Sequence, residues 1–304
     1  MAAATTGAAA AARRRLLRSV LYMPASNDRA LRKSLSLRAC DAFVYDLEDA
    51  VGPVDKVRAR DSMVAFLRDA SHREQLRTRA AVVRVNGIDT EWFHDDVRAV
   101  AEVRPDAVLL PKAESQEDVG HLRRVLGQAG DTPVWCMVET PRGVLAAREL
   151  AAAADVLVMG TVDLTNELKC STDPALHRAP ILGALLHTVM CARAATTRDR
   201  ECAVLDGVYV HLDDDEGFAR EAAQGLALGF DGKTIIHPKT VDAANAVFSP
   251  SADAVARARR VMDAYAFTKG GTMLLDGRLV EELHVRRAKA LLDMHDAIRA
   301  REVE

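Results

Sequence analysis

The sequence has no apolar run that approaches the roughly 20 residues needed to span a bilayer. It also has no strong excess of charge, since the formal net charge of its 304 residues is -3, and we therefore expect no nucleic acid and no membrane as a partner. With 49% hydrophobic and 28% charged residues, the composition is that of an ordinary globular protein. The length suffices for one large α/β domain with an ample core.

Paired cysteines and early acidic residues are also missing. The five cysteines are odd in number and contain no C-x-x-C pair, and Cys136 falls inside an apolar run. This usage indicates reduced thiols and a cytoplasmic location. Residues 1–15 are rich in Ala and Arg, and no acidic residue precedes Asp28. Such a start is typical of a disordered segment or of a transit peptide for the mitochondrial matrix, and its short length and few serines favour disorder.

Short apolar runs alternate with helical patterns along most of the chain. The expected strands are Ser19–Met23, Ala42–Leu47, Ala81–Val85, Ala107–Leu110, Val134–Val138, Val156–Met159, Gly207–Leu212 and Thr234–Ile236. Eight strand and helix units predict an α/β fold closed into a (β/α)8 TIM barrel. An open doubly wound sheet is the alternative. The first strand argues against it, because it continues as P-A-S-N-D and lacks a glycine-rich dinucleotide-binding turn.

The pattern changes after Pro250. Two expected helices, Ser251–Thr268 and Glu281–Arg299, flank a Gly-Gly link and a short strand or turn. Because the eight barrel units are complete before this point, the sequence predicts a barrel at residues 16–249 and a helical extension at residues 250–304. A lid that packs on a neighbouring subunit is the natural use for such an extension.

Two carboxylates follow neighbouring strands in the middle of the chain. The run Val134–Val138 ends at Glu139, and the run Val156–Met159 ends shortly before Asp163. Neighbouring parallel strands lie about 4.8 Å apart, so these side chains should emerge side by side. Two adjacent carboxylates repel each other unless a cation lies between them, and a divalent metal is the usual solution. The sequence therefore predicts a metal site at Glu139 and Asp163.

Other polar residues also gather at the expected strand ends. In a barrel these positions all face the C-terminal mouth, where TIM-barrel enzymes carry their active sites. Each residue alone has a structural alternative, such as a helix cap or an ion pair, but the set as a whole indicates an active site. Its members beyond Glu139 and Asp163 are Asp46, Glu48, Asp49, Arg84, Asn86, Lys112, His211, Asp213 and His237.

Seven strings occur in order along the chain: S-V-L-Y-M-P-A-S-N, Y-D-L-E-D-A-V, V-V-R-V-N, L-L-P-K-A-E-S, V-E-T-P-R-G-V, M-G-T-V-D-L and G-F-D-G-K-T-I-I-H-P. Together they resemble the citrate-lyase β-subunit-like family of CoA-ester lyases, which belongs with the HpcH/HpaI aldolases. The resemblance runs from about Arg18 to Ala290. It implies a (β/α)8 barrel, a homotrimer or hexamer, Mg²⁺ with Mn²⁺ as an alternative, and a CoA thioester as substrate. It also places the metal ligands at Glu139 and Asp163 and a substrate-binding arginine at Arg84.

The activity that the resemblance implies is a carbon–carbon lyase. Citramalyl-CoA or malyl-CoA would be cleaved to acetyl-CoA and pyruvate or glyoxylate. Mg²⁺ would chelate the hydroxyl and carboxylate groups of the substrate. The permanently charged, planar guanidinium of Arg84 suits a carboxylate or an enolate oxygen. Backbone N–H groups of Gly160, Thr161 and Val162 are expected to bind the substrate carboxylate.

Two other functions remain open at this point. One is a thioesterase that hydrolyses malyl-CoA in the same site. The other belongs to a different class, a non-catalytic subunit or CoA-ester-binding protein that keeps the barrel without the chemistry. The combination of Arg84, Glu139 and Asp163 argues against this second alternative.

A general acid/base is required to protonate the enolate. In the family it is an aspartate in a C-terminal G-x-M-I-D-x-P segment, and here residues 277–283 read G-R-L-V-E-E-L. Glu281 stands at the aspartate position and the proline is absent. Glu281 either transfers the proton or merely begins the last helix, where an acid is favourable. Asp46 is the alternative acid/base, and Glu48 and Asp49 are expected beside the metal-bound waters.

The phosphate groups of CoA require cations. Surface solvation is the alternative for each basic residue taken singly. The candidates are Lys112, Arg29, Lys33 and Lys56, with Arg32 and Arg60 beside them.

Overall fold

The computed structural model describes residues 16–303 except 172, 174–175, 198–199 and 267–271. Residues 1–15, for which disorder or targeting is expected, lie outside the described part. The chain divides into two compact units, of which one is Leu17–Val247 and the other contains the C-terminal segment from Phe248. Every helix in the described part is too short or too polar to cross a membrane.

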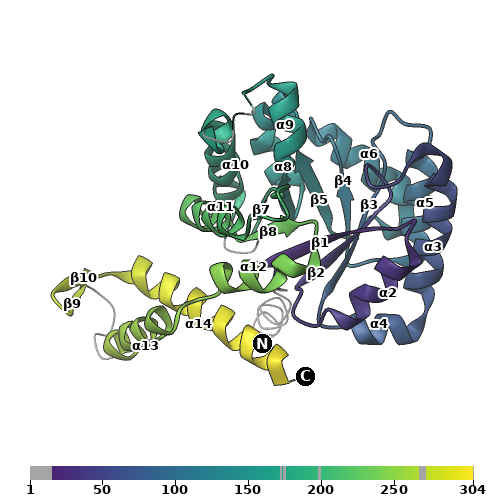
Figure 1. The fold of residues 1–304 in the computed structure, drawn as a ribbon. Helices are drawn as coiled ribbons and strands as arrows, with labels where there is room; N and C mark the ends of the chain where they lie inside the picture. The colour runs from purple at the N-terminus through teal and green to yellow at the C-terminus, as the bar shows by residue number, and fades with distance from the viewer. Residues whose placement is uncertain (1–15, 172, 174–175, 198–199, 267–271, 304) are drawn as a thin grey trace. The chain divides into compact units, whose positions relative to one another are not determined.

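The first unit is a closed barrel of eight parallel strands that pair in chain order, each with the next and the last with the first (Figure 1). This confirms the (β/α)8 prediction. The strands are β1 (Ser19–Pro24), β2 (Ala42–Asp46), β3 (Ala80–Arg84), β4 (Ala107–Leu110), β5 (Val134–Val138), β6 (Val156–Met159), β7 (Ala203–Asp206) and β8 (Gly232–Ile235).

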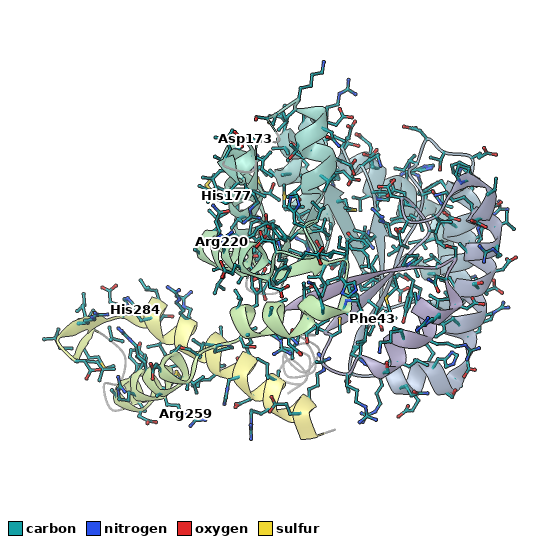
Figure 2. The ribbon with its side chains drawn as sticks, in the orientation of Figure 1. Phe43, Asp173, His177, Arg220, Arg259 and His284 are labelled. Atoms are coloured by element: carbon teal, nitrogen blue, oxygen red, sulfur yellow. The ribbon has the colours of Figure 1, made fainter. Side chains whose placement is uncertain are left out.

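Alternation along the strands builds two layers of core. Val20, Val44 and Val82 belong to a single cluster of mostly aliphatic side chains, together with Trp135 and Met137, which fills the inside of the barrel. The side chains between them point outward, toward the helices. Phe43, labelled in Figure 2, is such a residue on β2: it is fully buried, stacks near Tyr45 and lies under the guanidinium of Arg79.

Helices follow the strands and begin at recognisable caps. Asn27 accepts the N–H of Ala30 at the start of one helix, and Ser115 with Asp118 forms a capping box at another. The helices of this unit are α2 (Asp28–Ser36), α3 (Lys56–Arg68), α4 (Ala70–Leu76), α5 (Phe93–Val103), α6 (Gln116–Leu126), α7 (Pro141–Leu145), α8 (Ala147–Ala153), α9 (Thr161–Glu167), α10 (Leu182–Ala195), α11 (Asp215–Leu228) and α12 (Val241–Phe248).

The seventh strand is not where the sequence pattern placed it. The run Gly207–Leu212 alternates branched and aromatic residues, but it forms a loop in which Val210 and Leu212 are exposed. The strand is Ala203–Asp206, whose short apolar core pairs with β6 and β8. His211 and Asp213 therefore do not end a strand, and the prediction that they do is wrong.

The true end of β7 joins a buried charged network outside the barrel wall. Lys233 on β8 is fully buried and donates to Asp206, to Glu221 of α11 and to the carbonyl of Gly207, at 3.2, 2.7 and 2.6 Å. Arg178 donates to the other oxygen of Asp206 at 2.5 Å. These bonds fasten the segment before α10, the β7 end and α11 to one another.

The second unit contains α13 (Ala252–Ala266), a hairpin of β9 (Met273–Leu275) and β10 (Arg278–Val280), and α14 (Glu282–Val303). The turn residues Asp276 and Gly277 have φ values of 51° and 72°, as the Asp-Gly turn of a two-residue hairpin requires. The two helices and the hairpin share a small apolar cluster that includes Val261 and Val280.

Candidate active site

Polar and charged side chains from β1, β2, β3 and the end of β5 meet at the C-terminal mouth of the barrel. Tyr22, Asp46 and Arg84 stand on β1, β2 and β3 in the same alternation as the inward-facing Val20, Val44 and Val82, and Glu139 follows β5. Asp46 and Arg84 occupy paired positions of β2 and β3. The parallel register alone therefore brings these two side chains together.

The buried ion pair of Arg84 and Asp46 is bidentate. Arg84 Nε donates to Asp46 Oδ1 at 2.7 Å and Nη2 donates to Oδ2 at 2.6 Å. The two carboxylate oxygens also accept the N–H groups of Glu48 and Ala50. Burial alone would raise the pKa of Asp46, but Arg84 and these N–H groups outweigh burial and lower it. Asp46 thus holds Arg84 in place, and this geometry argues against its use as the alternative acid/base.

Glu48 lies between two cations. Its Oε1 accepts a bond from Lys112 Nζ at 2.6 Å, and its Oε2 lies 2.7 Å from Arg84 Nη1. Burial raises the pKa of Glu48 in spite of both cations. Lys112 remains 47% exposed, so its ammonium group lies at the open edge of the site. Asp49 is more exposed and lies 3.8 Å from Arg84 Nη1.

Glu139 is fully buried and only half satisfied. Its Oε1 accepts the backbone N–H of Lys112 at 2.7 Å, a bond made with Lys112 in the left-handed conformation at φ 50°. Its Oε2 is buried and has no hydrogen-bond partner among the described residues. Burial, together with the nearby charge of Glu48, raises the pKa of Glu139 to about 8. A buried carboxylate oxygen without a donor is costly, and a bound cation would remove that cost.

Asp163 lies in the first turn of α9, directly after β6, the strand that pairs with β5. It is partly exposed, and its carboxylate makes no hydrogen bond or ion pair within the described part of the chain. In that same part, no group of three or more His, Cys, Asp and Glu side chains could hold a metal. Two hard oxygen ligands that leave the other positions to water and substrate fit Mg²⁺. The assignment of Glu139 and Asp163 as its ligands stays a prediction.

The comparison with known proteins identifies the family. A family model described as HpcH/HpaI aldolase/citrate lyase matches residues 18–238. The chain belongs to this family. The resemblance inferred from the seven strings is therefore confirmed.

Named relatives within the HpcH/HpaI family span nearly the whole chain. The chain is 40% identical over 288 residues to a (3S)-malyl-CoA thioesterase of Cereibacter sphaeroides, which covers 93% of this chain and 96% of that protein. It is 31% identical over 292 residues to the citrate lyase subunit beta of Haemophilus influenzae, covering 91% and 96%. Among solved structures, the protein CitE of Mycobacterium tuberculosis in complex with magnesium, acetoacetate and coenzyme A has a TM-score of 0.74 and 28% identity, covering 92% of this chain and 100% of that one.

Two candidate contacts have other tasks in this HpcH/HpaI barrel. Lys56 is buried, and its three N–H groups donate to the carbonyls of Leu47 and Glu48 and to Asn86 Oδ1. No donor remains for a CoA phosphate, so that expectation is not supported. The N–H of Gly160 donates to the Val138 carbonyl at 3.1 Å, so it is not available to the substrate.

Other predicted residues stay predictions. Thr161 and Val162 open α9, where backbone N–H groups lack partners inside the helix. Arg29 and Lys33 are exposed on α2, as a contact to a phosphate requires. Glu281 precedes α14 in the second unit. Its N–H donates to Nδ1 of His284, which is labelled in Figure 2.

Tyr22 and Met137 also lie at the mouth, although no motif in the sequence predicts them there. Tyr22 is partly exposed inside the mouth, with the Arg84 guanidinium 5.0 Å from its ring centroid. Met137 precedes Glu139 by two residues on β5, and its sulfur contacts both Tyr22 and Arg84. The period of two along β1 could have identified Tyr22, since it shares a face with the inward-facing Val20.

Proposed function

We propose that this protein is a Mg²⁺-dependent enzyme that acts on a 3-hydroxyacyl-CoA of the malyl-CoA class and hydrolyses its thioester. The substrate class is supported chiefly by the unpartnered Oε2 of Glu139, at the same barrel mouth where Asp46 fixes the guanidinium of Arg84. Hydrolysis is supported by the 40% identity to a (3S)-malyl-CoA thioesterase over nearly the full length of both proteins.

The charges at the mouth favour a metal-bound acid as the ligand. Three carboxylates (Asp46, Glu48 and Glu139) face two cations (Arg84 and Lys112), so the site carries a net negative charge when all five are ionised. Mg²⁺, when bound, would offset this negative charge, and the ion can coordinate both the hydroxyl and the carboxylate group of the substrate. The half-exposed ammonium of Lys112 is placed to meet the CoA portion.

Hydrolysis needs an oxyanion partner and a proton carrier. Water adds to the thioester carbonyl carbon, the carbonyl oxygen takes the negative charge, and the carbon–sulfur bond then breaks as CoA leaves and gains a proton. Arg84 Nη1 is the guanidinium nitrogen not held by Asp46, and of its two N–H groups one can face Glu48 Oε2, 2.7 Å away, and the other this oxygen. Glu281 is our candidate for the group that moves the proton.

Glu281 would act in an oligomer. The hairpin before it exposes Leu274 and Leu279, and Leu283 just after it is exposed too, at 75%, 54% and 58%. Three exposed leucines around one acid support a surface that packs on another copy of the chain. We propose a trimer or hexamer in which this hairpin covers the barrel mouth of a neighbouring subunit.

Carbon–carbon cleavage is the second candidate reaction, because the chain is also 31% identical to a citrate lyase subunit beta. The substrate hydroxyl loses its proton as the bond between C2 and C3 breaks. The electron pair of that bond forms the enolate of acetyl-CoA, and an acid then protonates the enolate carbon. The other product is a keto acid, glyoxylate from malyl-CoA.

A product assay decides between the two reactions. The purified protein is incubated with (3S)-malyl-CoA and Mg²⁺, and free thiol, malate, acetyl-CoA and glyoxylate are measured. Free CoA with malate supports hydrolysis, and acetyl-CoA with glyoxylate supports cleavage. EDTA and Glu139→Gln should abolish turnover, while Glu117→Gln, an exposed site on α6, should not. Absence of both product pairs would exclude the proposed function.

The same assay tests Glu281 as the residue that moves the proton. Glu281→Gln should lower kcat by about 10²-fold or more, whereas Glu282→Gln, at the exposed neighbouring position, should not change it. Equal rates for the two variants would remove Glu281 from the mechanism. Running citramalyl-CoA in parallel measures the preference for the extra methyl group, which is worth about 1–3 kcal/mol in an apolar pocket.

A further inference from the structure

Tyr22 holds a phenol hydroxyl at the barrel mouth that neither candidate reaction has used so far. The hydroxyl donates to Met137 Sδ at 3.7 Å, and Arg84 Nη1 donates to the same sulfur at 3.6 Å. The guanidinium of Arg84 also lies over the Tyr22 ring, 5.0 Å from its centroid. Two donors from β1 and β3 therefore converge on one point beside β5.

The atom at that point is a poor acceptor. A thioether sulfur accepts hydrogen bonds only weakly, so neither donor gains a strong bond from Met137. Methionine is also unbranched, with three rotatable bonds, and can move aside at low cost. The two donors therefore form a site in which the Met137 sulfur occupies the position of a stronger acceptor, such as a substrate oxygen.

The number of donors indicates what that acceptor is. Arg84 Nε and Nη2 are both engaged by Asp46, so its bidentate edge is not available to a substrate carboxylate. The remaining donors are the Tyr22 hydroxyl and Nη1, which also lies 2.7 Å from Glu48 Oε2. Two donors from different directions suit a single oxygen atom better than a carboxylate. Burial raises the pKa of Tyr22, so the phenol stays a neutral donor throughout the physiological range.

We propose that Tyr22 Oη and Arg84 Nη1 together bind the thioester carbonyl oxygen of the substrate, in the place that Met137 Sδ occupies. This assignment rests on the proposed function. It serves both candidate reactions, because this oxygen gains negative charge when water adds to the thioester and also when the enolate forms. Donors that are fixed before the reaction stabilise such charge without reorganisation. Arg84 Nη1 carries two N–H groups, so one can face Glu48 Oε2, 2.7 Å away, while the other faces the substrate oxygen.

The test compares Tyr22→Phe with Tyr45→Phe. Tyr45 is a buried tyrosine of the same barrel, but it faces outward from β2 and its hydroxyl pairs with Ser34 at 3.1 Å. Both variants lose one phenol oxygen, and only one of them lies in the mouth. With malyl-CoA, Tyr22→Phe should lower kcat about 10- to 100-fold, as loss of a hydrogen bond to a charged oxygen does. Tyr45→Phe should retain the wild-type kcat.

Ligand binding separates this inference from the proposed function. Calorimetric titrations use acetyl-CoA and an acetyl-CoA analogue whose thioester is replaced by a carboxylate that mimics the charged oxygen. Tyr22→Phe should lose about 10-fold more affinity for the analogue than for acetyl-CoA. This ratio is measured within one variant, so it does not depend on the folded fraction of that variant.

Each outcome decides the question. If wild type does not turn over malyl-CoA but Tyr22→Phe shows the selective loss, the proposed function fails and the oxygen site stands. If Tyr22→Phe binds both ligands as wild type does, or loses affinity for both equally, the oxygen site is refuted whatever the enzyme does to malyl-CoA. Failure of wild type to bind either ligand overturns the oxygen site, and the product assay alone then decides the proposed function.

Discussion

Gly160 is the position where one added carbon atom should disable the proposed metal site. Its backbone has φ -95°, so alanine fits the backbone without strain. A Cβ at Gly160 would, however, lie 2.5 Å from Glu139 Oε2 and would also overlap Glu139 Cβ. The side chain of Glu139 passes through the space that the missing Cβ leaves open. We therefore expect Gly160→Ala to move Glu139 or the turn before α9.

The size of the effect follows from the burial of both residues. An extra methyl group in a filled site costs about 1–3 kcal/mol, and the lower entropy of the unfolded alanine variant returns about 0.4–1 kcal/mol. We expect a net loss of about 1–2 kcal/mol, a fall in melting temperature of about 2–4 °C per kcal/mol. Because Glu139 must shift from its place, affinity for Mg²⁺ should fall at least about 10-fold, which corresponds to 1.4 kcal/mol.

Gly183→Ala is the matched control. Gly183 lies in the first turn of α10, and a Cβ there would have no atom within 4 Å. This variant should be as stable as wild type or more stable by up to about 1 kcal/mol. Urea unfolding in EDTA and calorimetric titration with Mg²⁺ measure both variants. If Gly160→Ala matches Gly183→Ala in stability and in Mg²⁺ affinity, the reasoning is refuted.

Two further predictions concern Glu139 and Lys56. Because the pKa of Glu139 is raised to about 8 from 4.5, its contribution to stability in EDTA is complete below about pH 4.5 and is lost as the pH rises toward 8. Mg²⁺ binding must then release a proton, so the Mg²⁺-induced rise in melting temperature should grow from pH 6 to pH 8; an equal rise at both would contradict this. Lys56→Met removes the buried donor of Asn86 Oδ1 and one of the two donors of each of the Leu47 and Glu48 carbonyls. Urea unfolding should show a loss of about 2–4 kcal/mol. The exposed Lys33→Met should stay within about 0.5 kcal/mol, and equal losses would show that the bonds of Lys56 are not stabilising.

The sequence sufficed to predict the barrel and the gathering of charges at its mouth. Both follow from local patterns, the alternation of short apolar runs with helices and the polar residue after each run. The seventh strand was misplaced because the loop Gly207–Leu212 contains as many branched and aromatic residues as a strand, whereas Ala203–Asp206 has only three apolar residues. Strand pairing made the choice, and pairing depends on β6 and β8.

Partners across strands could not be predicted in the same way. The distance from Asp46 to Arg84 along the chain carries no information about their pairing, and only the register of β2 against β3 joins them. That pairing changes the interpretation of Arg84, because two of its guanidinium nitrogens bind Asp46 and the third, Nη1, lies 2.7 Å from Glu48 Oε2. Lys56 is a similar case. Its helical spacing indicates a surface cation, but its ammonium group is buried and donates to the carbonyls of Leu47 and Glu48, which follow β2.

The residues at the mouth do not by themselves select between hydrolysis and carbon–carbon cleavage. Both proposed reactions place negative charge on the same thioester oxygen, so the proposed roles of Arg84 and Tyr22 would be the same in each. They differ in where the proton is delivered, since cleavage protonates the carbon next to the thioester and hydrolysis protonates the departing sulfur. The residue that selects between the reactions should therefore be a proton carrier that reaches past the hydroxy-acid end of the substrate, which the metal would hold, to the thioester. Glu281 is the candidate, and its extra methylene relative to aspartate alters the reach of the carboxyl group. Glu281→Asp should shift the ratio of glyoxylate to malate formed from malyl-CoA, and an unchanged ratio would place the selection elsewhere in the site.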